Sequence, residues 1–303
     1  MSSIVLPRAV APRRAWLTDL PLLLVVAVVW GASYLAAKDI TTARTVLAVL
    51  VLRFAVVVPV LVVVGRRALL ALTAAQWRGA GLLGLILGGI FLLETYGVVH
   101  TSATNAGLII SLTMIFTPLA EAAVTRTRPS RAFLAAAGLS VLGVLLLTQN
   151  GGLSRPGGGD LLMLLAALAR TLHVLAMARL KGIRGAAALP LTTVQLTTAV
   201  VVFAILSAGG GGATPWATAA GFGAREWAGL LFLAVCCTLF AFFVQMWAVR
   251  RTSPSRVSLL LGTEPLWAAT AGIALGGERL GVWGLAGGAL VLVGTAWGRG
   301  AAR

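Results

Sequence analysis

Hydrophobic residues in this chain form long, uninterrupted runs, and the short segments between them are rich in arginine and glycine. The runs are about 17–25 residues long, the length that a helix needs to cross a bilayer core of about 30 Å. Hydrophobic and polar residues do not alternate with a period of two, which argues against a transmembrane β-barrel. The pattern therefore predicts an all-α polytopic membrane protein with ten transmembrane helices. The predicted spans are 20–38, 45–64, 79–98, 104–124, 132–148, 160–179, 189–208, 227–247, 257–275 and 281–298.

Composition supports a membrane protein. The 303 residues are 59% hydrophobic and 11% charged, with a mean hydropathy of +0.99, which exceeds what the core of a water-soluble protein can hold. The net charge of +16 would suggest nucleic-acid binding in a soluble protein. Here 17 of the 24 Lys and Arg residues lie in the termini and one alternate set of connections. The positive-inside rule places that set and both termini in the cytoplasm, so the expected partner is the lipid bilayer and not nucleic acid.

The N-terminal segment, residues 1–19, carries three arginines before the first hydrophobic run, which has no evident cleavage site. We therefore expect a cytoplasmic segment and a retained helix rather than a signal peptide. The adjacent Cys236 and Cys237 lie in a hydrophobic run and are expected to pack as small apolar side chains. Arginine outnumbers lysine 22 to 2, which suggests a GC-rich bacterial genome and therefore the bacterial inner membrane.

The chain consists of two copies of one unit. A shift of 151 residues aligns Tyr96–Thr148 with Trp247–Arg299 without a gap. We therefore predict a first five-helix repeat over residues 20–150 and a second over residues 151–303. Because each repeat has an odd number of helices, the second copy enters the membrane in the opposite orientation. Inverted repeats of this kind place a binding site near the bilayer midplane at their interface.

Residues 252–279 combine a hydrophobic span with an acid and a helix breaker at its middle, Glu264 and Pro265. In the first copy Met114 occupies the position of Pro265, and a proline follows later at Pro118. Helix breaks at membrane depth are tolerated where the freed backbone groups line protein or a cavity. We therefore predict that Pro118 and Pro265 break their helices and serve as gating elements.

Three ionisable residues fall near the middle of predicted spans, Arg53, Arg170 and Glu264, and Glu94 lies nearer the outer side. A charge at the helix centre costs about 2.5–3.5 kcal/mol on insertion scales, so each needs a partner or a water-filled cavity. These four residues are candidates for substrate binding or proton transfer. The alternative is structural, because an arginine can tie helices together through carbonyl oxygens and Glu264 can be the buried partner of an arginine.

His173 follows Arg170 by three positions, so both are expected on one face of a helix. There Arg170 would hold a substrate carboxylate, with His173 as a titrating neighbour. The alternative for His173 is a packed, hydrogen-bonded core residue. Aromatic and polar residues complete the candidate substrate-binding set. They are Trp30, Tyr34, Tyr96, Asn105 and Phe243.

The sequence contains no G-x-S-x-G, H-E-x-x-H, P-loop or Cys/His metal motif, so no enzyme activity, cofactor or metal is expected. An intramembrane enzyme acting on lipid-linked substrates would need a nucleophile or a metal site. A non-transporting scaffold would use its costly buried charges only to pair helices. A transporter accounts for the charges better; it would bind a small-molecule substrate and use a proton if coupled. The sequence does not set its oligomeric state, and a monomer is compatible with this role.

Several short motifs along the chain, some of them paired between the two repeats, carry a resemblance to a known family. They are Trp30-Gly31, Leu52-Arg53-Phe54, Tyr96 with residues 101–106, residues 252–256, Glu264-Pro265 and residues 277–279. With these motifs the chain resembles the EamA-type members of the drug/metabolite transporter superfamily. The resemblance covers nearly the whole chain and implies a ten-helix, two-repeat carrier of small metabolites, some members of which export amino acids, including aromatic ones. Arg170 and His173 depart from the family pattern, which commonly has an aromatic residue and a tyrosine there.

The leading hypothesis is a secondary carrier that exports a small polar metabolite, most simply an amino acid, by alternating access. The four aromatic candidates would form apolar walls, and Arg170 would meet a substrate carboxylate. Glu94 or Glu264 would meet an amine or carry a coupling proton. The alternative is an exporter of cationic drugs or a carrier of nucleotide-sugar-like metabolites.

Overall fold

The computed structural model describes residues 15–148, 157–210, 212–251, 257, 261–277 and 281–301, and regular structure within these residues is helical. The longer helices are α1 (Ala15–Ile40), α2 (Val46–Leu70), α3 (Ala74–His100), α6 (Arg131–Thr148), α7 (Gly158–Arg179), α8 (Ala188–Gly209) and α14 (Val282–Ala301). The shorter helices are α4 (Ala103–Ile110), α5 (Thr113–Thr125), the 3-10 helix η1 (Lys181–Ile183), α9 (Pro215–Ala220), α10 (Ala224–Leu231), the π-helix η2 (Phe232–Phe240), α11 (Ala241–Arg251) and α13 (Glu264–Ala274).

Six helical segments are long and apolar enough to cross a membrane. They are Pro21–Ile40, Val46–Leu70, Ala74–His100, Gly158–Arg179, Ala188–Gly209 and Ala224–Arg251. The other four predicted spans fall on α4 with α5, on α6, on α13 with the residues before it, and on α14. The all-helical class and the multi-pass membrane character are therefore confirmed, and the count of ten spans stays a prediction.

The helix boundaries follow local capping chemistry. α3 begins at a capping box. The backbone N–H of Gln76 donates to Thr73 Oγ1 at 3.3 Å, and the backbone N–H of Thr73 donates to the side-chain Oε1 of Gln76 at 2.9 Å. At the start of α7 the Gly157 amide donates to Asp160 Oδ2 at 2.8 Å. These polar residues satisfy backbone N–H groups that would otherwise lack an acceptor at a helix start.

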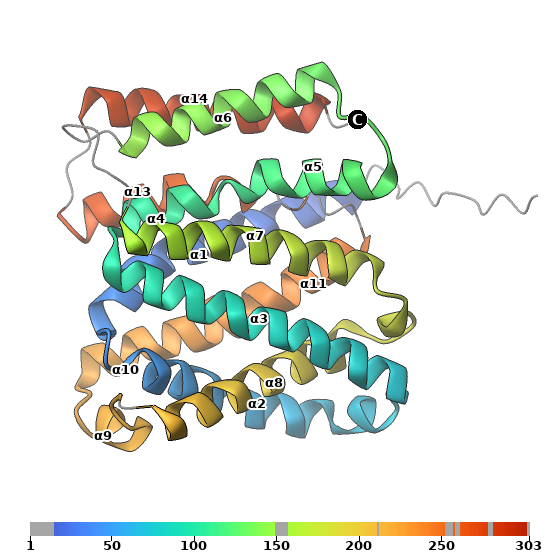
Figure 1. Cartoon of the computed structure of the whole chain (residues 1–303), viewed down its shortest axis with the longest axis vertical. Helices are drawn as coiled ribbons and strands as arrows, with labels where there is room; N and C mark the ends of the chain where they lie inside the picture. The colour runs from blue at the N-terminus through green and yellow to red at the C-terminus, as the bar shows by residue number, and fades with distance from the viewer. Residues whose placement is uncertain are drawn as a thin grey trace, which may run out of the picture.

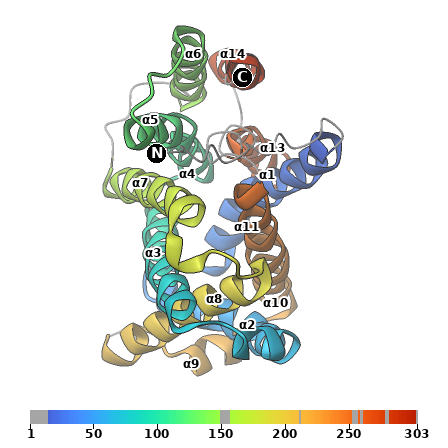
Figure 2. The same cartoon turned by 90° about the vertical axis from the view of Figure 1, so that its right-hand side faces the viewer.

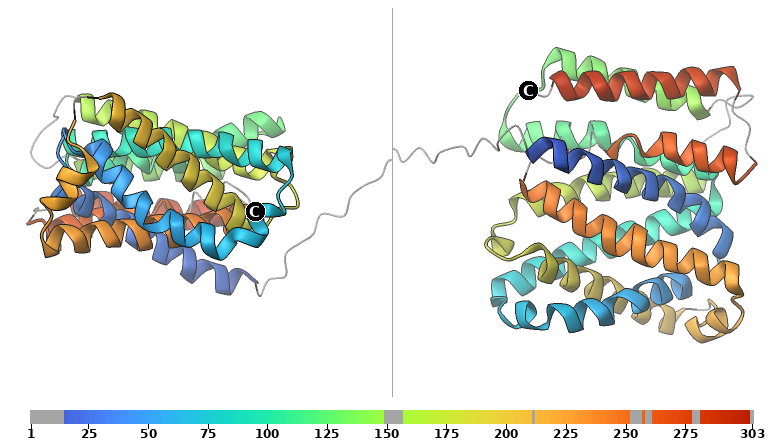
Figure 3. Two further views of the ribbon diagram at one scale, coloured as in Figure 1. Left: turned by 90° about the horizontal axis from the view of Figure 1, so that it is seen from below. Right: turned by 180° about the vertical axis from the view of Figure 1, so that it is seen from behind.

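The helices lie side by side, and their connections gather on two opposite faces (Figure 1). One face holds the α2–α3, α5–α6 and α7–α8 connections, together with the start of α1 and the end of α14 (Figures 1 and 3). The arginine-rich connections lie on this face, as the positive-inside pattern requires. That this face meets the cytoplasm stays a prediction, and the predicted segment 1–19 lies mostly outside the described residues.

At one end of the bundle, α6 and α14 pack against each other as a pair, and at the other end α2 packs with α8 and α9 (Figure 2). Gly294 allows the first contact, because a Cβ atom there would lie 2.2 Å from Ser140 Oγ and 2.8 Å from the Ala136 carbonyl oxygen. Small residues that let backbones approach are typical of helix packing in membranes.

The fourth span of each repeat is interrupted at the same place. In the first repeat a turn at residues 111–112 separates α4 from α5. In the second repeat a turn at residues 262–263 precedes α13. The two turns are related by the same shift of 151 residues that aligns the sequences. The interruption is therefore a property of the repeat.

The predicted break at Pro118 is wrong, because Pro118 lies inside α5, beyond the turn that interrupts the span. Pro265 lies in the first turn of α13, so the predicted break there agrees with the observed helix start. Proline is tolerated in a first turn because the N–H that it lacks would have no intrahelical acceptor.

The hydrophobic core is centred on the interface between the repeats. The shift of 151 residues matches Phe91 on α3 with Phe242 on α11, and these two rings pack with their centroids 5.3 Å apart. A residue that contacts its own repeat equivalent lies near the axis relating the two copies. Phe54 packs on Phe91 at 4.8 Å, and Trp30 packs on Phe242 at 5.3 Å. Aromatic packing therefore surrounds the centre of the bundle.

Candidate functional site

A cluster of charged side chains lies between the repeats, next to this aromatic core. Arg170 on α7 faces two carboxylates: its Nε lies 2.6 Å from Glu94 Oε1, and its Nη1 donates to Glu264 Oε2 at 3.1 Å. Glu94 comes from α3 in the first repeat, and Glu264 comes from α13 in the second. The structure thus brings three of the predicted site residues together.

Two residues of α1 complete the cluster. The Tyr34 hydroxyl donates a short hydrogen bond to Glu264 Oε1, on the side away from Arg170. The guanidinium carbon of Arg170 lies 4.7 Å from the ring centre of Trp30, an arrangement in which the indole face attracts the cation. The Trp30 indole nitrogen donates to the Cys237 carbonyl at 2.8 Å, which orients the ring beside the arginine.

Gly31 brings α1 close enough to α13 for these contacts. A Cβ atom at this position would lie 2.6 Å from Trp267 Cβ and 2.7 Å from the Glu264 carbonyl oxygen. Any larger residue would push the two helices apart and separate Tyr34 from Glu264. The Trp30-Gly31 pair therefore has a geometric role in the cluster.

The two acids differ in their surroundings. The Glu264 side chain is 2% exposed and accepts hydrogen bonds from both Tyr34 and Arg170. The Glu94 side chain is 13% exposed, and among the described residues its Oε1 has no aligned hydrogen-bond donor, so its contact with Arg170 is an ion pair. With all three charged groups ionised, the cluster carries one net negative charge. Glu264 is therefore the acid held by two hydrogen-bond donors, and Glu94 is the acid held by fewer contacts.

Arg53 occupies a different place from Arg170. Its Nε donates to Thr238 Oγ1 at 2.6 Å and to the Leu233 carbonyl at 3.1 Å, both in the π-helix η2. The Thr238 hydroxyl also donates to the Leu233 carbonyl, at 2.8 Å, and the arginine stacks on Phe91 at 4.7 Å. A π-helix disrupts the usual i→i+4 bonding, so Arg53 satisfies a carbonyl oxygen there. This geometry matches the structural alternative for Arg53, in which the arginine ties helices together through carbonyl oxygens.

His173 turns toward α8 rather than toward the carboxylates. Its Nε2 lies 2.8 Å from Gln195 Oε1, and the His173 side chain is buried. A small internal pocket next to it is also lined by Thr192 of α8 and Phe242 of α11. The packed, hydrogen-bonded alternative matches this placement, and a titrating role beside Arg170 has no direct contact to support it.

Phe243, a predicted cavity wall, is not the aromatic residue of this segment that packs on the charge cluster's neighbours. The Phe243 side chain is 37% exposed, whereas the neighbouring Phe242 is 8% exposed and packs on Trp30. The π-helix η2 immediately precedes these residues, and its extra residues per turn rotate the side chains that follow. A prediction based on the α-helical period cannot see this rotation, but the match of Phe242 with Phe91 in the repeat could have identified it.

The remaining two candidates, Tyr96 and Asn105, make other contacts than those of the charge cluster. Tyr96 is half-buried and packs against the main hydrophobic core. The backbone N–H of Asn105 donates to Ser102 Oγ at 2.9 Å, so the Ser102 side chain caps the start of α4. A role for either residue in substrate binding stays a prediction. Among the described residues, no group of three or more His, Cys, Asp or Glu side chains could hold a metal ion.

Comparisons with known proteins agree with the two-repeat architecture. The EamA-like transporter family matches residues 18–149 and, separately, residues 157–297. No curated protein matches this chain. A similar solved structure, named "Crystal structure of protein", is 17% identical, covers 92% of this chain and 96% of its own, and has a TM-score of 0.66. That likeness concerns the fold alone.

Proposed function

Because the chain belongs to the EamA-like transporter family, we propose that it is a secondary transporter that exports small polar metabolites, most simply amino acids, from a bacterial cytoplasm. The observation that carries this proposal is the Arg170 cluster, in which both repeats contribute a carboxylate to one buried guanidinium. A site at the interface of inverted repeats is where rocking of one repeat against the other would alternate access.

A zwitterion matches the chemistry of this cluster. Its carboxylate would replace Glu94 on the Arg170 guanidinium, and its ammonium group would then pair with the released Glu94 carboxylate. Each buried charge keeps an opposite partner through this exchange, which matters because leaving one partner of a buried ion pair alone costs about 3–5 kcal/mol. A simple anion would displace Glu94 in the same way but would leave it without a cation.

Glu94 is the residue expected to exchange partners. Glu264 is fixed by Tyr34 as well as by Arg170, whereas Glu94 is more exposed and contacts Arg170 only as an ion pair. If export is coupled to protons, Glu94 is accordingly the residue that would carry the proton. Trp30 and Tyr34 would form the walls of the site, because they already contact the charged groups.

A second candidate is the export of organic cations. Two carboxylates share one arginine, so the cluster has one negative charge in excess, and a bound cation would neutralise it. The two candidates differ in their need for Arg170, because only the zwitterion requires a free guanidinium.

The test is uptake of labelled amino acids and of a lipophilic cation into proteoliposomes with an imposed pH gradient. We expect Glu94→Gln and Arg170→Ala each to lower amino-acid flux by more than about tenfold. The exposed variant Asp39→Asn, which removes only a surface ion pair with Arg225, is the control and should transport normally. Cation flux that survives Arg170→Ala would favour the second candidate, and undiminished amino-acid flux in both site variants would reject the cluster as the substrate site.

A further inference from the structure

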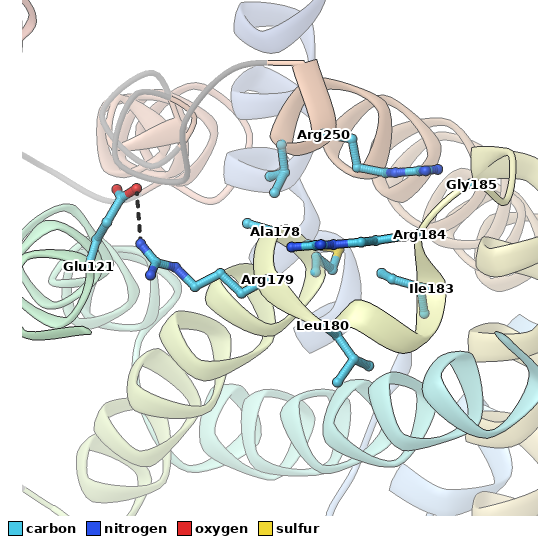
Figure 4. Close-up of a pocket in the computed structure, with 10 residues that line it drawn as sticks. Glu121, Ala178, Arg179, Leu180, Ile183, Arg184, Gly185 and Arg250 are labelled. Carbon is cyan, nitrogen blue, oxygen red and sulfur yellow. Dashed lines mark ion pairs between the residues drawn. The ribbon is translucent and has the colours of Figure 1, made fainter. Parts of the chain in front are cut away.

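A cavity of about 390 Å³ opens where α7 ends, on the face that carries the arginine-rich connections (Figure 4). Three arginines line it: Arg179 at the end of α7, Arg184 after the 3-10 helix η1, and Arg250 near the end of α11. Arg179 lies nine residues beyond Arg170, about 13 Å along the helix, so this cavity is separate from the charge cluster. We call it the arginine vestibule.

The vestibule has a surplus of positive charge. Arg179 Nη2 lies 3.7 Å from Glu121 Oε1, and Figure 4 shows its side chain turned toward that acid. Figure 4 also shows Arg184 reaching across the cavity near Arg250. Neither Arg184 nor Arg250 takes part in an ion pair within the described part of the chain. Two guanidinium groups therefore face one cavity without a carboxylate of their own.

The segment that carries Arg184 is held in place. The Gln76 side-chain nitrogen donates to the Arg184 carbonyl oxygen at 3.0 Å. Gly182 packs on α3, where a Cβ atom would lie 3.2 Å from the Ala75 carbonyl oxygen, and a Cβ atom on Gly79 would lie 2.9 Å from Ile183 Cγ2. These contacts fasten the segment to α3 and fix the backbone from which Arg184 extends. The position of the charge is therefore set by tertiary packing.

The vestibule shares one lining residue with a second, smaller pocket between the helices. Met177 lines the vestibule and also lines the small internal pocket that contains His173 and Phe242. Phe242 packs on Trp30, which in turn lies on Arg170. Met177, Phe242 and Trp30 are thus the described side chains that relate the vestibule to the charge cluster.

We propose that the arginine vestibule is a binding site for an anionic group, a carboxylate or a phosphate, at the mouth of the route to Arg170. Guanidinium groups bind such oxyanions through paired N–H donors. A cleft lined by one sign of charge also concentrates ions of the opposite sign. Only the role as a mouth rests on the proposed transport, since anion binding can be measured without it. The anion is either a free solute or the headgroup of an acidic lipid, which basic pockets at this face also bind.

The experiment measures thermal stability of the protein in nanodiscs of neutral phosphatidylcholine, with inorganic phosphate or acetate titrated against potassium chloride at matched ionic strength. A ligand that binds the folded state raises the Tm. We expect an upward shift of about 3 °C for the wild type and for Arg66→Gln/Arg67→Gln, a matched pair of exposed arginines outside the cavity. The Arg184→Gln/Arg250→Gln variant should lose the shift.

A parallel series in nanodiscs containing phosphatidylglycerol separates the two sources of the anion. Loss of the phosphate shift there, together with a higher starting Tm that disappears in Arg184→Gln/Arg250→Gln, would assign the site to a lipid headgroup. A phosphate shift that persists would assign it to a free solute. Equal shifts in all three proteins, or no shift in any, would overturn the site. Because no flux is measured, failure here leaves the test of the Arg170 cluster untouched.

Discussion

The interrupted spans of the two repeats have a backbone turn at the same place but carry different side chains beside it. Both turn at equivalent positions, residues 111–112 and 262–263. In the second repeat, the turn is followed by Glu264, which meets Arg170 and Tyr34. The equivalent residue in the first repeat is Thr113, an uncharged side chain. The repeated architecture therefore supplies the break twice, and only one copy uses it to place a charge.

The opposite asymmetry occurs in the neighbouring spans. The first repeat supplies Glu94 from α3, and the residue 151 positions later is the uncharged and buried Gln245. Each repeat thus contributes one acid, from a different element, to the single arginine. Pseudosymmetry gives the scaffold its interface, and departures from symmetry build the site.

The largest effect is expected from removing the acid at the second break. Glu264→Ala leaves two buried donors, the Tyr34 hydroxyl and Arg170 Nη1, without their acceptor at about 1–3 kcal/mol each, so we expect a loss of about 4 kcal/mol in unfolding free energy. Denaturant unfolding in mixed micelles would measure it. The repeat-equivalent control, Thr113→Ala, should stay close to wild type. Equal losses in both variants would mean that the break itself, and not the charge, carries the stability.

Two adjacent aromatics test how the π-helix orients the second repeat. Phe242→Ala removes a ring packed on Trp30 and Phe91, and we expect a loss of about 3 kcal/mol in stability. Phe243→Ala removes an exposed ring and should cost far less in the same unfolding measurement. A larger loss for Phe243→Ala would contradict the inward placement of Phe242.

The π-helix is present in α10–η2–α11 and has no counterpart in the continuous α3. Thr238→Val removes the hydroxyl that accepts from Arg53 and donates to the Leu233 carbonyl, so we expect a loss of about 1–2 kcal/mol. Thr197→Val, whose hydroxyl bonds only to the Thr193 carbonyl one turn earlier, is the control. Thermal unfolding should separate the two, and indistinguishable midpoints would show that Arg53 does not depend on the Thr238 hydroxyl.

The smallest effects are expected at the prolines. Pro265→Ala should keep α13 starting at the same place, because the turn at 262–263 is shared with a repeat that has Met114 at the equivalent position. Pro118→Ala removes a proline from within α5 and should leave that helix continuous. Flux within about twofold of wild type is expected for both. Abolished flux in Pro265→Ala alone would restore the proline to a gating role.

The helical two-repeat architecture could be predicted from the sequence because the patterns that indicate it are local or periodic. Hydrophobic run length indicates a membrane helix, and the 151-residue match identifies the repeat without any structural information. The cost of a buried charge singled out Arg170, Glu94 and Glu264 before their contacts were known. Sequence reasoning missed Phe242, which follows a π-helix and packs on Trp30 and Phe91, and it failed at Pro118, where a proline does not interrupt its helix.

Hydrophobic run lengths, the internal repeat and the buried charges identify a two-repeat helical membrane protein whose charges require partners, without any structural information. The partners themselves depend on how the helices pack: Arg170 pairs with two acids, Arg53 satisfies a π-helix carbonyl, and His173 bonds to Gln195. The physical reason is that periodicity and burial cost act along one helix, whereas pairing depends on distances of a few ångströms between helices far apart in sequence. Those distances follow from close contacts such as that of Gly31 with α13.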